Sequence, residues 1–172
     1  MAVLRIRKLG DPVLREKARP VERFDGTLRR LVDDMLETMY AAPGVGLAAP
    51  QVGVSLRLFV YDDGEGNTGA VANPELSDLE DEETRDEGCL SIPGPFFPMV
   101  RSLRATLRGL DAEGRPLELR GEGLLARIFQ HETDHTQGVL YIDRLPPEGR
   151  REVMRLLRDH EVKQQQERSP TP

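Results

Sequence analysis

The chain has 172 residues, of which 38% are hydrophobic and 31% are charged, and its formal net charge is -6. This length suffices for a domain with a hydrophobic core. The acidic balance argues against DNA or another nucleic acid as the main partner, and no apolar run approaches the roughly 20 residues that a membrane helix needs. The N-terminus lacks the apolar core of a signal peptide, so we expect a cytoplasmic protein. We also expect a monomer.

The first helical signal follows Asp25, a residue type that caps helix N-termini. Apolar residues three and four apart then predict one buried helix face, which ends before Pro43 and Gly44. The members of this face are Leu28, Leu31, Val32, Met35, Leu36 and Met39.

Short strand-like pieces follow, separated by Gly, Asp and Pro turns, and they predict an antiparallel sheet. These pieces start at Leu56, Gly69, Leu103 and Pro116. The acidic stretch 77–88 is interpreted as a solvated strand or loop. A calcium site would need alternating carboxylates in a glycine-punctuated loop, and the stretch lacks that pattern.

From Gly123 the helical period returns and predicts a helix that ends near Gly138. A last helix is expected after Pro147, and residues 164–172 are polar enough for a disordered tail. Helix, sheet, helix order favours an α+β fold, with mostly antiparallel sheets around the helix before Gly138 and with N-terminal and C-terminal helices. We predict a single catalytic domain over residues 1–163.

The helix before Gly138 contains HETDH, which matches the H-E-x-x-H pattern of zinc hydrolases. His131 and His135 project from one helix face, so their imidazoles can bind one ion. Glu132 lies beside that ion, as a general base acting on bound water would. Tyr141 stands where the longer protease signature has its third histidine. A third ligand is therefore expected elsewhere in the chain.

Cys89 is the single cysteine, so the chain cannot form an internal disulfide. A lone thiol in a reducing compartment is a buried small residue, a nucleophile or a metal ligand. Because the helix lacks its third ligand, metal ligation is the favoured interpretation. Gly88 allows close backbone approach, and Pro93 with Gly94 is expected to end the local extended segment. A thiolate weakens the Lewis acidity of the ion, so donors for a developing oxyanion are needed nearby.

A candidate donor lies in GVGLAAPQ, residues 44–51, where two glycines precede the side-chain amide of Gln51. Together GVGLAAPQ, EGCLS and QHETDH resemble the three motifs of the bacterial-type peptide deformylases. The resemblance covers residues 4–158 and includes the opening IRKLGDPVL.

This resemblance implies one divalent metal ion, with Fe(II) as the expected native ion and zinc, nickel or cobalt as substitutes. It implies Glu132 as the residue that takes a proton from water and returns it to the leaving amine. The side chain of Gln51 and the backbone N–H of Leu90 are implied as oxyanion donors. The implied substrate is the N-formyl-methionyl end of a newly made polypeptide, hydrolysed to formate and a free amine. The implied metal ligands are Cys89, His131 and His135.

The peptide is expected to add as a strand along the backbone of Val45 and Gly46, a mode that ignores most side chains. Its methionine side chain is expected in an apolar pocket, and a tight fit around the formyl group would exclude acetyl groups. The residues assigned to substrate binding are Val45, Gly46, Leu47, Glu87, Gly88, Arg127 and Ile128.

Several residues have two interpretations. Phe96 and Phe97, in a Pro-rich segment interpreted as a loop, would rim the substrate groove, although simple packing is the favoured reading. Asp134 and Arg101 form either a pair that orients the helix or an ordinary surface ion pair. Thr136, where most relatives have leucine, is expected to affect packing only.

The last predicted helix carries arginines that would suit a transient contact with ribosomal RNA. Their interleaving with Glu152 and Asp159 instead favours an ordinary charged face. The arginines are Arg150, Arg151, Arg155 and Arg158.

Two rival functions remain. A metallopeptidase would need a downstream His or Glu ligand, and His160 falls outside the usual spacing. A non-enzymatic protein with a degenerate site would lack some of the reacting groups, yet all of them are present.

Overall fold

The computed structural model describes residues 2–168. The five strands of this part form one antiparallel sheet in the order β1-β2-β3-β4-β5, which together with the helices confirms the α+β class. The α-helices are α1 (Gly26–Ala41), α2 (Leu124–Thr136) and α3 (Pro147–Arg168), and the short 3-10 helices are η1 (Pro12–Arg15), η2 (Ala49–Val52) and η3 (Tyr141–Arg144). The strands are β1 (Gly46–Ala48), β2 (Leu58–Asp62), β3 (Thr68–Cys89), β4 (Ile92–Leu110) and β5 (Pro116–Glu122).

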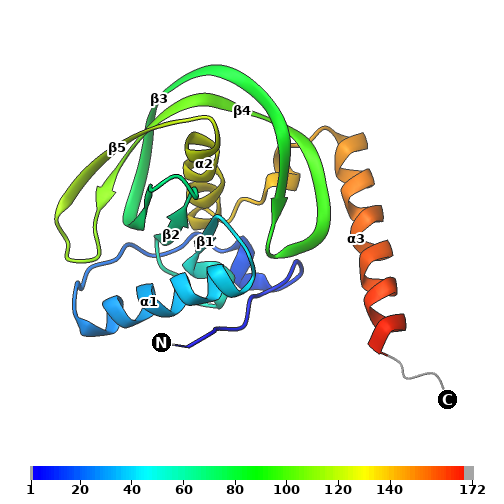
Figure 1. Ribbon diagram of the computed structural model, residues 1–172, viewed down its shortest axis with the longest axis horizontal. Helices are drawn as coiled ribbons and strands as arrows, with labels where there is room; N and C mark the ends of the chain where they lie inside the picture. The colour runs from blue at the N-terminus through cyan, green and yellow to red at the C-terminus, as the bar shows by residue number, and fades with distance from the viewer. Residues whose placement is uncertain (1, 169–172) are drawn as a thin grey trace.

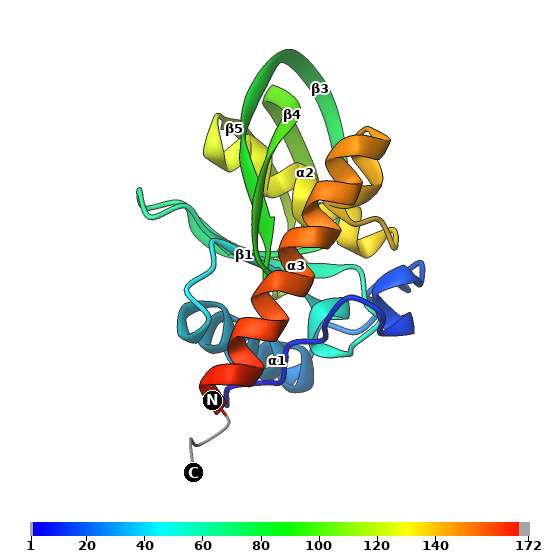
Figure 2. The same cartoon turned by 90° about the vertical axis from the view of Figure 1, so that its right-hand side faces the viewer.

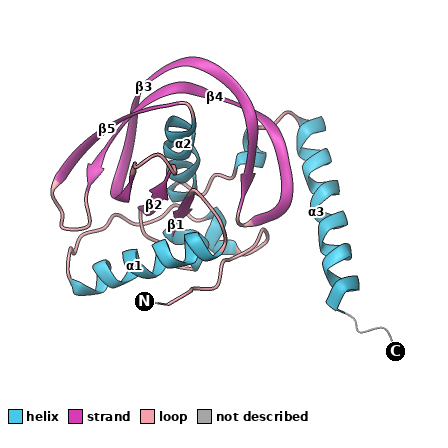
Figure 3. Ribbon diagram, in the orientation of Figure 1, coloured by secondary structure: helices cyan, strands magenta, loops and turns pink. Residues whose placement is uncertain are grey.

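β3 and β4 form a long hairpin that arches over α2 (Figure 1). Their pairing shifts register at three places, the last between Glu87 and Cys89. Such irregularities bend strands and increase their twist. The curvature brings the end of β3, with Cys89, back against α2. Figure 3 shows α2 enclosed between this arch and the short strands β1 and β2.

α2 lies at the centre of the molecule, as the sequence predicted. Ala126, Ile128 and Phe129 are buried against the strands. The helix also buries charged and polar side chains, among them Glu132 and Asp134. Because buried polar groups require partners, this composition marks α2 as the element that carries a site.

α1 covers the face of β1 and β2 opposite α2 (Figure 1). Its predicted cap is confirmed, because Asp25 accepts hydrogen bonds from the backbone N–H groups of Thr27 and Leu28 at 3.0 and 3.1 Å. The predicted apolar face packs into a core cluster that contains Met35 and Met39.

Two local predictions were wrong. Pro93 and Gly94 do not end the extended segment, since β4 begins at Ile92 and runs through the Pro-rich stretch, which is a strand and not a loop. The tail does not begin at residue 164, because α3 continues to Arg168; residues 169–172 lie outside the described part. Figure 2 shows α3 lying across one side of the molecule. No helix within residues 2–168 combines the length and apolarity needed to cross a membrane.

Candidate active site

Three predicted metal ligands meet between β3 and α2. The Nε2 atom of His135 lies 3.4 Å from the Sγ atom of Cys89 and 3.1 Å from the Nε2 atom of His131. All three donor atoms lie within 4.8 Å of one another. Zinc bonds of about 2.0 Å to nitrogen and 2.3 Å to sulfur would place neighbouring tetrahedral donors roughly 3.3–3.6 Å apart. The donor set therefore fits a divalent metal ion.

A carboxylate fixes the orientation of His131. Its Nδ1 atom lies 2.8 Å from the Oε2 atom of Glu87, and its other ring nitrogen, Nε2, lies 3.1 Å from the Nε2 atom of His135. Burial alone would raise the pKa of Glu87, but hydrogen bonds from His131 and Arg101 hold that pKa well below its ordinary value. A carboxylate behind a histidine ligand is the usual support of a metal site.

Glu87 and Arg127 were predicted to bind substrate, but the polar ends of these side chains bind other groups. Arg127 donates through Nη1 to the Oε1 atom of Glu87 at 3.1 Å and to the carbonyl oxygen of Met99 at 3.0 Å. Both side chains border the active-site cavity, yet their charges neutralise each other inside the protein. These contacts indicate that Arg127 holds Glu87 and that Glu87 in turn holds His131, while both side chains also shape the cavity.

The two histidines have different environments. Burial, and then the charge of His131, lower the pKa of His135 well below its ordinary value, which keeps that ring neutral and able to bind a metal. At His131 burial lowers the pKa, but hydrogen bonds to Cys89 and Glu87 raise it overall. A metal ion bound at this histidine would replace that proton.

Glu132 is buried beside the ligands. Its Oε2 atom has no hydrogen-bond partner among residues 2–168, and burial raises the pKa of the carboxyl group to about 7. Gly46 is required opposite this side chain, because a Cβ atom at residue 46 would lie 2.4 Å from Oε1. A carboxyl group with a pKa near neutrality can both accept and return a proton.

Gln51 is held with its NH₂ group toward Cys89. Its Oε1 atom accepts the backbone N–H of Ala48 at 2.9 Å, so Nε2 must point the other way. Nε2 donates to the Oγ atom of Ser91 at 3.1 Å and lies 3.6 Å from the Sγ atom of Cys89. Ser91 was not singled out from the sequence, although it follows Cys89 by two residues in EGCLS.

A cavity of about 530 Å³ opens above these groups. Val45, Gly46 and Ile128, which were assigned to substrate binding, line this cavity, and so does Leu90, which was assigned as an oxyanion donor. Leu47 is the exception, because its fully buried side chain packs in the core beneath α1. Lys8, which the sequence did not indicate, also lines the cavity and donates through Nζ to the carbonyl oxygen of Leu90 at 2.9 Å.

The two phenylalanines of β4 point in different directions. Phe96 is 68% exposed and borders the cavity. Its ring lies directly over Gly88, where a Cβ atom would come within 2.6 Å of it, so the glycine permits this contact. Phe97 instead packs toward Gly149 of α3. The rim interpretation therefore fits Phe96, and the packing interpretation fits Phe97.

The pair between Asp134 and Arg101 is buried, with a distance of 2.7 Å from Nη1 to Oδ2. It is therefore not a surface ion pair. Thr136 is also buried, and its hydroxyl group donates to the carbonyl oxygen of Thr133 at 2.7 Å, which agrees with a packing role.

A central H-E-x-x-H helix with a Cys/His/His donor cluster is typical of hydrolases that use a metal ion. A family model described as polypeptide deformylase matches residues 3–151. The peptide deformylase of Acidothermus cellulolyticus is 55% identical over 161 residues, which cover 94% of this chain and 89% of that relative. The peptide deformylase of Thermotoga maritima is 49% identical over 156 residues, which cover 90% and 94%.

Solved structures show the same similarity. A crystal structure of a peptide deformylase from Legionella pneumophila superposes with a TM-score of 0.90 at 46% identity, covering 98% of this chain and 100% of that one. The peptide deformylase from Thermus thermophilus gives 0.87 at 48% identity, covering 96% and 99%. The chain belongs to the polypeptide deformylase family and is an enzyme of the hydrolase class.

Proposed function

We propose that this enzyme removes the N-formyl group from the initiator formyl-methionine of newly synthesised polypeptides and releases formate. The observation that carries the proposal is the Cys/His/His donor cluster next to a cavity whose lining includes Cys89, His131 and Glu132. The names of the relatives in this family agree with the same reaction.

The metal ligands in this proposal are Cys89, His131 and His135. Imidazole and thiolate donors suit Fe(II), which we expect as the native ion, and also zinc, nickel and cobalt. When bound, the ion supplies a Lewis acid that makes water nucleophilic at neutral pH.

Glu132 moves the proton in this mechanism. Its carboxylate accepts a proton from the attacking water, and the resulting carboxyl group gives that proton to the amine nitrogen as the C–N bond breaks. Burial raises the pKa of this carboxyl group, which favours uptake of the proton from water.

Two donors stabilise the negative charge that develops on the formyl oxygen. The side-chain NH₂ group of Gln51 is fixed toward Cys89 before substrate arrives, and the backbone N–H of Leu90 is the second donor. Fixed donors of this kind need no reorganisation during the reaction.

The substrate backbone is proposed to add to β1, which forms an outer edge of the sheet. Gly46 is the first residue of this edge strand, and both Val45 and Gly46 border the cavity, so the peptide would run along this part of the backbone. Recognition through the main chain tolerates many sequences. The methionine side chain then enters the apolar part of the cavity at Val45, Ile128 and the stem of Arg127.

We further propose that a monomer in the cytoplasm is the active form, since one chain contains every group named above. Ribosome contact through α3 has less support. Arg155 pairs within α3 with Glu152 and Asp159, at 2.6 and 2.9 Å, as expected for an ordinary charged face.

Formate release tests the proposal. Protein purified without oxygen and analysed for metal is assayed with a formyl-methionyl peptide and with its acetyl counterpart. We expect formate from the first and no turnover of the second, because a tight site around the formyl group would exclude the larger acetyl group. Equal activity on both peptides would contradict the substrate assignment, and cleavage of internal peptide bonds without formate would favour a metallopeptidase.

Changing Gln51 to leucine is expected to lower kcat by about 10²-fold, the usual effect of losing one oxyanion donor, with a smaller change in KM. Gln164→Leu, an exposed position on α3, is the control and should leave kcat unchanged. Steady-state formate assays at equal metal content give the comparison. A Gln51→Leu enzyme with unaltered kcat would remove Gln51 from this role.

A further inference from the structure

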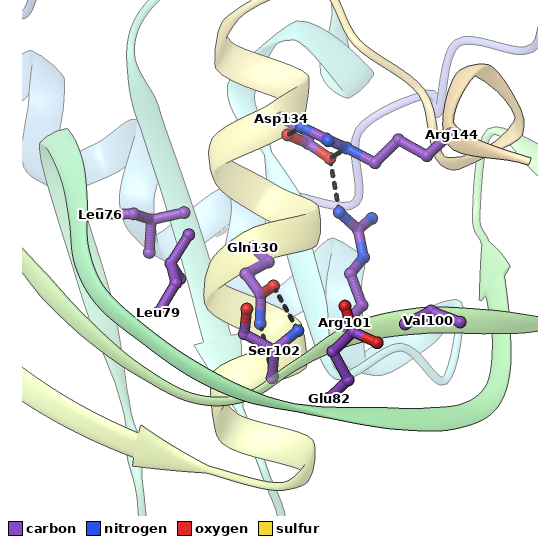
Figure 4. Close-up of a pocket in the computed structure, with 9 residues that line it drawn as sticks. All are labelled: Leu76, Leu79, Glu82, Val100, Arg101, Ser102, Gln130, Asp134 and Arg144. Carbon is purple, nitrogen blue, oxygen red and sulfur yellow. Dashed lines mark hydrogen bonds and ion pairs between the residues drawn. The ribbon is translucent and has the colours of Figure 1, made fainter.

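A row of alternating charges connects the protein surface to His131. Arg144 binds Asp134, Asp134 binds Arg101, Arg101 binds Glu87, and Glu87 binds the Nδ1 atom of His131. Figure 4 shows the outer part of this row, with the guanidinium groups of Arg144 and Arg101 both directed at Asp134. Arg144 lies outside the three motifs recognised in the sequence.

The outer link is a two-point contact. Arg144, on η3, donates through Nε to Oδ2 and through Nη2 to Oδ1 of Asp134, both at 2.7 Å. The Arg144 side chain is 49% exposed, whereas that of Asp134 is 11% exposed. The two residues border a cavity of about 250 Å³ that shares no lining residue with the active-site cavity. Arg144 therefore has no direct access to substrate.

The inner link passes through Arg101, which is buried between two carboxylates. One edge of its guanidinium donates to Glu87 through Nε at 3.1 Å and Nη2 at 2.7 Å, while Nη1 donates to Asp134 at 2.7 Å. A guanidinium group is planar and rigid, so fixing one edge fixes the direction of the other. Movement of Asp134 would consequently be transmitted to Glu87.

We propose that Arg144 is a positioning residue for the metal ligand His131. By holding Asp134 it fixes the guanidinium of Arg101, and that guanidinium sets the Glu87 carboxylate that orients the imidazole. The inference rests on the proposed metal-binding function, since it concerns the affinity of the same site.

Losing the charge of Arg144 and losing its positioning role would change the metal affinity in opposite directions. A measurement of metal affinity can therefore separate the two effects. Removing the positive charge of Arg144 would, by Coulomb attraction alone, strengthen binding of a cation nearby. Loosening the row would weaken binding, because the His131 ring would lose its fixed direction. Groups that support a metal ligand typically change metal affinity by about 10–100-fold when they are removed.

The test measures zinc dissociation constants of the full chain by competition with a chelator. Arg144→Met is expected to raise the dissociation constant about tenfold, the lower end of that range, because Arg144 acts through other side chains. Arg144→Lys should also raise it, since an ammonium group cannot make the planar two-point contact. Arg155→Met is the matched control, because Arg155 also pairs with two carboxylates but lies exposed on α3, and it should stay within about twofold of wild type.

Two further measurements separate positioning from general destabilisation. The absorption spectrum of the cobalt-loaded protein reports ligand geometry and should change in Arg144→Met but not in Arg155→Met. In an Asp134→Asn background, Arg144→Met should cause little additional loss of affinity, because both residues act along one row. Thermal unfolding of each metal-free variant checks that the fold is retained.

An unchanged or lower dissociation constant in Arg144→Met would overturn the inference, as would independent, additive losses in the double variant. Wild-type protein that binds no zinc would instead overturn the proposed metal site itself. The two failures are therefore distinguishable.

Discussion

Changing Glu132 to glutamine is expected to lower kcat for formate release by about 10⁴-fold, the upper end of the range for a general acid and base. The metal content should not change, because the Cys/His/His donor set is left intact. Glutamine keeps the shape that fits against Gly46 but cannot accept the proton from water. The Oε2 atom of Glu132 has no partner within the described protein, so no structural hydrogen bond at that atom is lost.

The measurement pairs formate release with metal analysis of the same sample. Glu148→Gln, an exposed position in the first turn of α3, is the matched control and should keep both activity and metal. A Glu132→Gln protein that had lost its metal would show a structural role for Glu132, contrary to the proposal. Wild-type turnover by this variant would remove it from the mechanism.

Changing Cys89 to alanine is expected to abolish stable metal binding, from about one ion per chain to almost none, together with activity. Two imidazoles would remain, and they cannot supply the three protein ligands of a catalytic site. Metal content is measured after gel filtration without added metal. Ser91→Ala, two residues further along the chain, should retain the metal and so controls for disturbance of this segment. Metal retained by Cys89→Ala would show that Cys89 is not a ligand.

The single cysteine also permits a direct test in the wild-type protein. A metal-bound thiolate is shielded from thiol reagents, and Cys89 is 9% exposed in any case. We expect chelation of the metal to accelerate modification of Cys89. Identical rates before and after chelation would contradict ligation by this thiol.

Features set by local spacing were predictable from the sequence. His131 and His135 are four residues apart, and helix geometry alone places such side chains on one face. The structure confirms that the two rings converge. The cap at Asp25 is equally local. The missing third histidine directed attention to Cys89, whose sulfur lies 3.4 Å from His135.

Features set by strand pairing were less predictable. The Pro-rich stretch after Pro93 is a strand because it pairs with β3, although its composition is typical of a loop. Val45 borders the cavity while Leu47 enters the core, and the packing of β1 between α1 and the cavity decides this difference. Local composition contains no information about that packing.

The sequence by itself determined the family resemblance, the α+β class and the candidate reacting groups, because each depends on short motifs in a fixed order. Only the tertiary structure decided what surrounds those groups. Three contacts join residues that are 10 to 44 positions apart in the chain. They are Glu87 with His131, Ser91 with Gln51, and Arg144 with Asp134. The first contact arises because the bent hairpin closes over α2, and the other two join separate elements that meet only in the folded chain. No periodicity in the chain specifies any of them.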